Sequence, residues 1–234
     1  GSSGGLTLST APAAAAVNIT GSSGADIITA LGTGNHTLSM GAGNDSVDFN
    51  GTYTRLDTYD GGDGTDTLKV DGNTNNSGLN ATIFDNLTNV EVLEVTGNAA
   101  VVSLDSDTPF ASVNLSDSDD QTLNLNDGYT QATTVTINAA ADDTINNNAN
   151  VDLTVNAYSG AIGASFNLTG SSGNADTINI TAVTNNQSNT FDAGNDVFET
   201  INVVPYTAGA DVTVVTGAYA LSAALGSTQL TINA

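Results

Sequence analysis

Residues 40–71, MGAGNDSVDFNGTYTRLDTYDGGDGTDTLKVD, hold seven aspartates set among glycines. The only two Lys or Arg residues in the 234-residue chain, Arg55 and Lys69, lie in the same stretch. Carboxylates this close together repel one another. The chain must therefore hold them apart, leave them disordered, or neutralise them with a cation that it does not encode.

The stretch contains part of a nine-residue repeat. Four units can be written: GSSGADIIT (21–29), LGTGNHTLS (31–39), MGAGNDSVD (40–48) and GGDGTDTLK (61–69). The fourth position is always glycine, the eighth is always Ile, Leu or Val, and the sixth is aspartate in all but one unit, which has His36. Because self-similarity at a fixed period is the mark of a repeat architecture, we expect stacked, similar turns.

From about residue 88 the chain changes to short alternating strands. Eleven segments place apolar side chains at every second position, with Thr, Asn or Ser between them: 90–95, 101–104, 112–115, 122–126, 134–138, 152–156, 165–168, 177–180, 200–204, 211–215 and 229–233. This period of two predicts strands. The one segment with some helical periodicity is 218–226 (AYALSAALG).

These patterns predict an all-β protein, a right-handed parallel β-roll or β-helix (β-solenoid). A β-sandwich is the alternative for the C-terminal part, because evenly spaced short strands also occur in sandwiches. We expect an entry segment or linker at 1–20 with a break at Pro12, a glycine–aspartate roll at 21–72, and a Thr/Asn-rich solenoid continuation at 73–234.

Composition excludes several functions. A net charge of −23 disfavours binding to nucleic acid or to anionic membranes. No apolar run is long enough to span a bilayer. The chain lacks cysteine, has a single histidine, and shows no nucleophile motif, so we expect no enzymatic activity and no thiolate metal site.

The units resemble the RTX nonapeptide G-G-x-G-x-D-x-U-x, in which U is a large aliphatic residue and stacked turns bind calcium. GGDGTDTLK matches every defined position, and the other units each lack at least one glycine. The resemblance implies half a coil per nonapeptide, so that Asp26, Asp45 and Asp66 stack on one edge with Ca²⁺ between successive turns. The metal-binding candidates are Asp26, Asp45, Asp63 and Asp66 with the turn glycines Gly24, Gly41, Gly43, Gly62 and Gly64. The opposite edge, with His36 and the irregular segment 49–60, is expected to bind calcium weakly or not at all.

Weaker candidates lie elsewhere. The segments 193–201 (with Gly194, Asp196 and Phe198) and 171–179 (with Asp176) keep part of the repeat, and the acidic loops 105–107 and 116–121 could supply oxygen ligands. For all of these, ordinary turns or solvated acids are the simpler interpretation. Arg55 is expected to pair with a neighbouring aspartate.

The layout is also similar to the calcium-dependent surface-layer (S-layer) proteins of Gram-negative bacteria, a type I-secreted RTX group that is acidic and cysteine-free. The order of GSSGAD, MGAGND, an irregular insertion, GGDGTD and a VEVLEV strand carries this resemblance, and its calcium motif covers only residues 21–69. It implies a secreted, extracellular structural protein that self-associates into a lattice, with cell-surface polysaccharide or an anchoring domain of the same chain as possible partners. The alternative is a calcium-binding RTX module of a secreted adhesin or exoenzyme.

Overall fold

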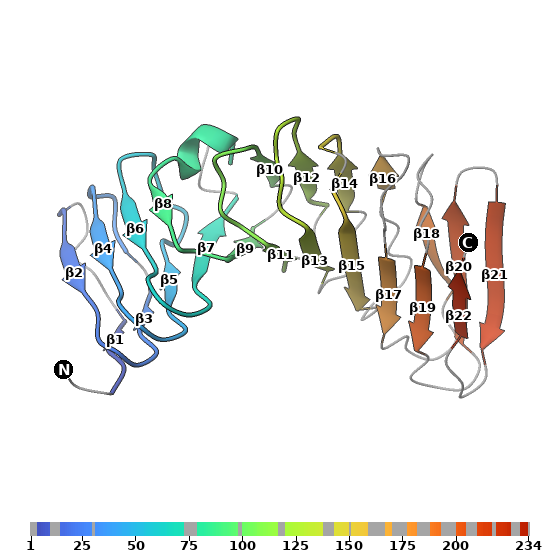
Figure 1. Ribbon diagram of the computed structural model, residues 1–234, viewed down its shortest axis with the longest axis horizontal. Helices are drawn as coiled ribbons and strands as arrows, with labels where there is room; N and C mark the ends of the chain where they lie inside the picture. The colour runs from blue at the N-terminus through green and yellow to red at the C-terminus, as the bar shows by residue number, and fades with distance from the viewer. Residues whose placement is uncertain are drawn as a thin grey trace.

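The protein is a β-solenoid whose strands up to β20 follow one another along the long axis of the molecule in chain order (Figure 1). This computed structural model describes residues 4–9, 15–29, 31–72, 79–97, 100–116, 120–137, 143–149 and 151–158, followed by strands 167–169, 177–181, 188–192, 200–204, 210–216, 219–225 and 230–233. Odd-numbered strands up to β19 build one long sheet, which β22 completes, and even-numbered strands up to β20 build two shorter sheets, the second of which β21 completes. Each coil therefore contributes one strand to the long sheet and one to a short sheet.

The long sheet contains β1 (Thr7–Leu8), β3 (Ile27–Ile28), β5 (Ser46–Asp48), β7 (Thr67–Asp71), β9 (Val92–Thr96), β11 (Ser112–Leu115), β13 (Thr133–Ile137), β15 (Leu153–Tyr158), β17 (Thr177–Thr181), β19 (Thr200–Val204) and β22 (Leu230–Asn233). The first short sheet contains β2 (Asn18–Thr20), β4 (Thr37–Ser39), β6 (Thr58–Asp60) and β8 (Leu87–Thr88). The second short sheet contains β10 (Val101–Leu104), β12 (Thr122–Leu125), β14 (Thr144–Asn147), β16 (Asn167–Thr169), β18 (Ser188–Asp192), β20 (Ala210–Thr216) and β21 (Tyr219–Leu225). A short 3₁₀ helix, η1 (Ala81–Phe84), lies between β7 and β8.

The core is a stack of aliphatic side chains in register. In the long sheet, seven residues pair in sequence across parallel neighbours and are all fully buried: Ile28, Val47, Leu68, Leu93, Val113, Val135 and Val155. The eighth position of three repeat units supplies the first three of these. A one-residue slip would turn every member to solvent, so burial of this column fixes the register along the solenoid.

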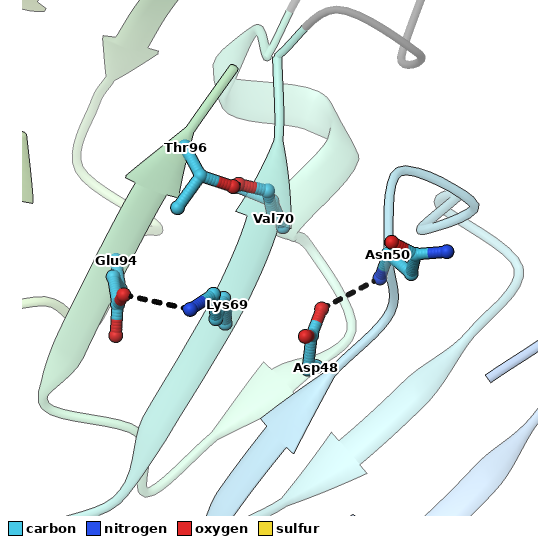
Figure 2. A network of polar contacts seen from close by, with 6 residues as sticks. All are labelled: Asp48, Asn50, Lys69, Val70, Glu94 and Thr96. Atoms are coloured by element: carbon cyan, nitrogen blue, oxygen red, sulfur yellow. Dashed lines mark hydrogen bonds and ion pairs between the residues drawn. The ribbon is translucent and has the colours of Figure 1, made fainter. Parts of the chain in front are cut away.

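Polar side chains cover the outer face of the long sheet. Lys69 on β7 lies in register between Asp48 on β5 and Glu94 on β9, and its Nζ lies 2.9 Å from Glu94 Oε1 (Figure 2). Asp48 Oδ1 instead accepts the N–H of Asn50 at 2.7 Å. Arg55 makes no ion pair with any residue that the structure describes, so the expected Arg55–aspartate pair is wrong.

The expected fold is confirmed, and its C-terminal part is solenoid rather than sandwich. Parallel pairing continues to β19 in the long sheet and β20 in the second short sheet. Only the last strands, β21 and β22, pair antiparallel with their neighbours. The segment with some helical periodicity, 218–226, contains strand β21, which forms an antiparallel ladder with β20. Strands β1 and β2 from segment 1–20 pair with β3 and β4. Among the described residues, no helix has the length and hydropathy needed to cross a membrane.

Candidate metal centre

Three aspartates from the repeat lie in one file at an edge of the solenoid. Asp26, Asp45 and Asp66 each directly precede a strand of the long sheet, and these strands pair in parallel register. All three side chains are at most 1% exposed. Their spacing of 19 and 21 residues thus predicted their stacking correctly, while metal binding by them stays a prediction.

Hydrogen bonds link the file from coil to coil. The backbone N–H of Asp26 donates to Asp45 Oδ1 at 2.7 Å, and that of Asp45 donates to Asp66 Oδ1 at 2.7 Å. The N–H of Asp66 continues the series to Glu91 Oε2 at 2.9 Å. At the other end, the N–H of Leu6 donates to Asp26 Oδ1. We call Asp26, Asp45, Asp66 and Glu91 the acidic ladder. In each of these residues, one carboxylate oxygen accepts a hydrogen bond from a backbone N–H of the preceding coil.

The second carboxylate oxygens of Asp26, Asp45 and Asp66 differ in whether they have a hydrogen-bond partner. Oδ2 of Asp45 and Oδ2 of Asp66 are buried and have no hydrogen-bond partner. Asp26 differs, because its Oδ2 accepts the N–H of Ser22 at 2.7 Å and its Oδ1 accepts Ser22 Oγ at 2.9 Å. A buried, unsatisfied polar atom costs about 1–3 kcal/mol, and more when the group is charged. Asp45 and Asp66 therefore each present an oxygen that lacks a ligand or a donor.

The pKa values of these carboxyls follow the same division. Burial is the largest effect on Asp45 and raises its pKa, and the charge of Asp26 adds to the rise. Burial likewise raises the pKa of Asp66, with added repulsion from Asp45, Glu91 and Asp60. For Asp26, burial is outweighed by hydrogen bonds from Leu6 and Ser22, so its pKa is lowered. Without a cation, Asp45 and Asp66 therefore resist ionisation more than Asp26 does.

The turns that precede Asp45 and Asp66 depend on glycine. Gly41, Gly43, Gly62 and Gly64 have φ values of +103°, +138°, +98° and +145°, a region that L-residues rarely adopt. The turns also stack too closely for side chains, since a Cβ on Gly64 would lie 1.7 Å from the carbonyl oxygen of Gly43. Gly24, at the same place in the first unit, is not among the glycines with positive φ, and its N–H bonds Ser22 Oγ at 3.1 Å.

The opposite edge carries a second ladder without the spare oxygens. His36 Nδ1 accepts the N–H of Val17 at 3.3 Å, and the N–H of His36 donates to Asp57 Oδ1 at 2.8 Å. Asp57 Oδ2 accepts both the N–H (2.8 Å) and Oγ1 (3.0 Å) of Thr54. Since His36 Nε2 bonds the carbonyl of Gly32 at 2.9 Å, its ring is satisfied on both sides. An acceptor at the sixth repeat position thus has a structural task that needs no metal.

Sequence reasoning missed Glu91 and Asp57 as ladder members, because neither follows a glycine-rich turn. A weaker signal was present in both. Each is an acceptor side chain two residues before a buried apolar residue, Leu93 or Tyr59, which is the relation of Asp45 to Val47. The ladder position can therefore be recognised from an acceptor-x-apolar pattern at the start of a strand.

The ligand atoms present limit which metal ions could bind at the acidic ladder. Among the described residues, no three His, Cys, Asp or Glu side chains come together as a metal site on their own. The side chain of Asp63 is exposed, and its backbone instead bridges the turns, donating to Gly41 O and accepting from Gly43 N–H, both at 2.8 Å. An ion at the acidic ladder would draw many of its oxygens from backbone carbonyls. Calcium fits these oxygen ligands, since it binds six to eight oxygens in flexible geometry.

The weaker candidates contribute little here. In loop 105–107, the N–H of Asp107 donates to Asp105 Oδ1 at 3.1 Å, as in an ordinary turn. Gly194, Asp196, Phe198 and Asp176, and residues 117–119 of loop 116–121, lie outside the described residues. No protein-family model, no curated protein and no solved structure matches this chain.

Proposed function

We propose that this chain is a calcium-dependent structural protein of the cell surface, part of a secreted surface layer whose copies assemble into a lattice. The acidic ladder carries the proposal. It holds buried carboxylates whose second oxygens, on Asp45 and Asp66, lack a donor, in a chain of net charge −23. The RTX-like units 21–69 support the identity of the ion, and the proposal assigns the chain no enzymatic role.

Calcium would bind between the turns of Asp26 and Asp45 and between those of Asp45 and Asp66. Oδ2 of Asp45 and Oδ2 of Asp66 are the side-chain ligands available, and the carbonyls of the adjoining glycine turns are the nearby neutral oxygens. The ion would supply the positive charge that the chain lacks. Because it would bind the folded turns and not the unfolded chain, its binding free energy would stabilise the solenoid.

An extracellular location follows from the same chemistry. Extracellular calcium modules have dissociation constants of about 10⁻⁴–10⁻³ M, which suits the calcium concentrations outside cells. The polar outer faces, rich in Thr, Asn and Ser, belong to an elongated rod, and few large apolar side chains are exposed among the residues whose burial the structure describes. Such a rod would be stable in water as a coat component and would meet its neighbours through polar contacts.

Calcium-dependent assembly of the full chain tests this function. We would follow particle size by light scattering and by negative-stain electron microscopy as calcium is added to EGTA-treated protein, with Asp45→Asn in parallel. Ordered sheets or growing oligomers that need calcium and are weakened in Asp45→Asn are expected. A calcium-bound chain that stays monomeric would contradict lattice formation and would favour the module of a secreted adhesin or exoenzyme. A chain that binds no calcium would overturn both.

A further inference from the structure

The strands in the middle of the solenoid carry no charge, although the chain has a net charge of −23. None of the strands from β10 to β17 contains Asp, Glu, Lys or Arg. Earlier on the long sheet, Lys69 and Glu94 lie on the outer face. In the middle coils, the exposed acids Asp107, Asp127 and Asp152 lie between strands. The outer faces of these coils are therefore kept free of charge.

Two rows of small polar side chains make up this surface on the long sheet. In the first row, Asn114, Thr136, Asn156 and Asn179 pair in sequence across β11, β13, β15 and β17. The second row is the Ser or Thr that lies two residues earlier on each of these strands. All of these side chains are partly exposed. We call the two rows the neutral face.

Hydrogen bonds between side chains order these surfaces from coil to coil. On the neutral face, Asn179 Nδ2 donates to Asn156 Oδ1 at 2.9 Å. On the second short sheet, Asn146 Nδ2 donates to Asn124 Oδ1 at 2.6 Å, and Asn124 Nδ2 donates to Ser103 Oγ at 3.2 Å. A surface whose side chains are already ordered loses less conformational entropy when a partner binds.

Period and charge both indicate a second copy of the chain as the partner. The rows repeat at the spacing of neighbouring strands, about 4.8 Å. Another copy has the same period, so its side chains can fit between these, as Asn ladders do between paired sheets. Two chains of net charge −23 repel each other except where neither presents charge. Contact at the neutral face leaves the exposed acids at the rim, where water and salt screen them.

We infer that the neutral face is a contact between copies of this chain. The inference rests on the proposed function, because it assigns one contact of the proposed lattice. A small polar face gives a weak contact, which a lattice uses many times. The ladder on the second short sheet lies across the common core and gives each copy another uncharged surface. Contacts can therefore continue from copy to copy instead of ending at a dimer.

A single added charge tests the contact. We would measure the protein concentration at which the full chain assembles in calcium, by light scattering and negative-stain electron microscopy, for the wild type, Asn156→Asp and Thr136→Asp. Asn156→Asp keeps an oxygen that accepts Asn179 Nδ2 and adds a carboxylate within the neutral face. Asn80→Asp is the matched control, because Asn80 is exposed outside that face and its Oδ1 likewise accepts a side-chain donor, Thr82 Oγ1, at 2.7 Å.

We expect Asn156→Asp and Thr136→Asp each to raise the concentration needed for assembly at least about tenfold, with Asn80→Asp unchanged. Circular dichroism in calcium is expected to match the wild type for all three variants, which separates loss of contact from loss of fold. If both face variants assemble as the wild type does, or if Asn80→Asp weakens assembly equally, the contact is refuted and the proposed lattice stands. A wild type that stays monomeric in calcium would overturn the lattice, and with it a second copy as the partner of this face.

Discussion

The backbone N–H of Asp45 donates to Oδ1 of Asp66 one coil further on, at 2.7 Å, and Oδ2 of Asp66 is left buried without a partner. The same carboxylate therefore has two separable tasks. One oxygen satisfies the preceding turn, as Asp57 does for His36 on the opposite edge. The other is available to an ion, and this division allows structural and metal-dependent contributions to be measured separately.

Replacing Asp45 by asparagine separates the two tasks. The amide oxygen can still accept the N–H of Asp26, while the charge that repels Asp26 is lost. We expect the free energy of unfolding in EGTA to be unchanged or higher than in the wild type, and in calcium to be lower. Denaturant unfolding in both conditions measures this.

The control for that prediction is Asp57→Ala, which removes an acceptor of the same kind from the opposite edge. It is expected to destabilise by about 1–3 kcal/mol equally with and without calcium. If Asp45→Asn lowers the free energy of unfolding by the same amount in EGTA and in calcium, Asp45 binds no stabilising calcium ion.

The pH dependence of stability is expected to change sign when calcium is added. Burial raises the pKa of Asp45 and of Asp66 in the folded state. Carboxyls raised in this way favour folding when protonated, so their contribution is fully present below the unfolded pKa of about 4 and is lost as the pH rises through the folded value. Asp26, whose pKa is lowered, acts in the opposite sense.

In EGTA we therefore expect the contribution of Asp45 and Asp66 to the free energy of unfolding to fall from about pH 4 towards neutrality. Calcium requires the ionised carboxylates, so in its presence stability is expected to rise over the same window. Unfolding curves at several pH values test this, with Asp66→Asn expected to flatten both trends. Parallel slopes in EGTA and calcium would argue against an ion at the ladder.

The stacked turns predict a large cost for a single methyl group. Gly64 has φ +145°, and its added Cβ would lie 1.7 Å from the carbonyl oxygen of Gly43. We expect Gly64→Ala to destabilise by about 2–4 kcal/mol, from backbone strain and overpacking together. Gly128 is the control, because it also has a positive φ (+95°) but a Cβ added to it would lie 3.7 Å from its nearest neighbour, the Cβ of Ser106. Gly128→Ala is expected to destabilise by only about 1 kcal/mol. Equal costs would mean that close stacking of the turns is unimportant.

His36 is expected to act as an acceptor rather than as a ligand. His36→Leu removes the acceptor of the Val17 N–H, and we expect faster hydrogen exchange at Val17 and a loss of about 1–3 kcal/mol. His36→Asp restores the sixth residue of the repeat and is expected to protect Val17 again. Unaltered exchange in His36→Leu would show that this bond does not hold the first coil.

Much of the fold could be predicted from local pattern. The strands at 101–104, 112–115 and 200–204 were placed at their observed bounds, because two or three apolar side chains alternate in each. Strand β14 was missed because Ile145 is its only apolar residue. Its other buried side chain, Asn147, is polar and donates a hydrogen bond from Nδ2 to the carbonyl oxygen of Val151. The weak helical periodicity at 218–226 was misleading, because β21 pairs antiparallel with the neighbouring strand β20.

The candidate site was predictable only where glycine and aspartate recur together. The spacing of Asp26, Asp45 and Asp66 predicted that they stack, because each interval in the sequence corresponds to one coil of the solenoid. Glu91 occupies the next place after an interval of 25 residues, which includes η1, so no fixed period could find it. Which carboxylate oxygens lack a donor depends on how the turns stack, and the repeat alone does not reveal it.

Thermal unfolding of the full chain in EGTA and in calcium, for the wild type and Asp66→Asn, is the sharpest test of whether calcium binds the acidic ladder and stabilises the solenoid. At a calcium concentration of 100 times the dissociation constant, each site is expected to stabilise the folded wild type by about 2.7 kcal/mol, with a clear rise in Tm. Asp66→Asn is expected to lose a large part of that rise while unfolding in EGTA at or above the wild-type temperature. A wild-type Tm that is the same in EGTA and in calcium would contradict the account, and the glycine–aspartate units would then be hydrogen-bonded turns and nothing more.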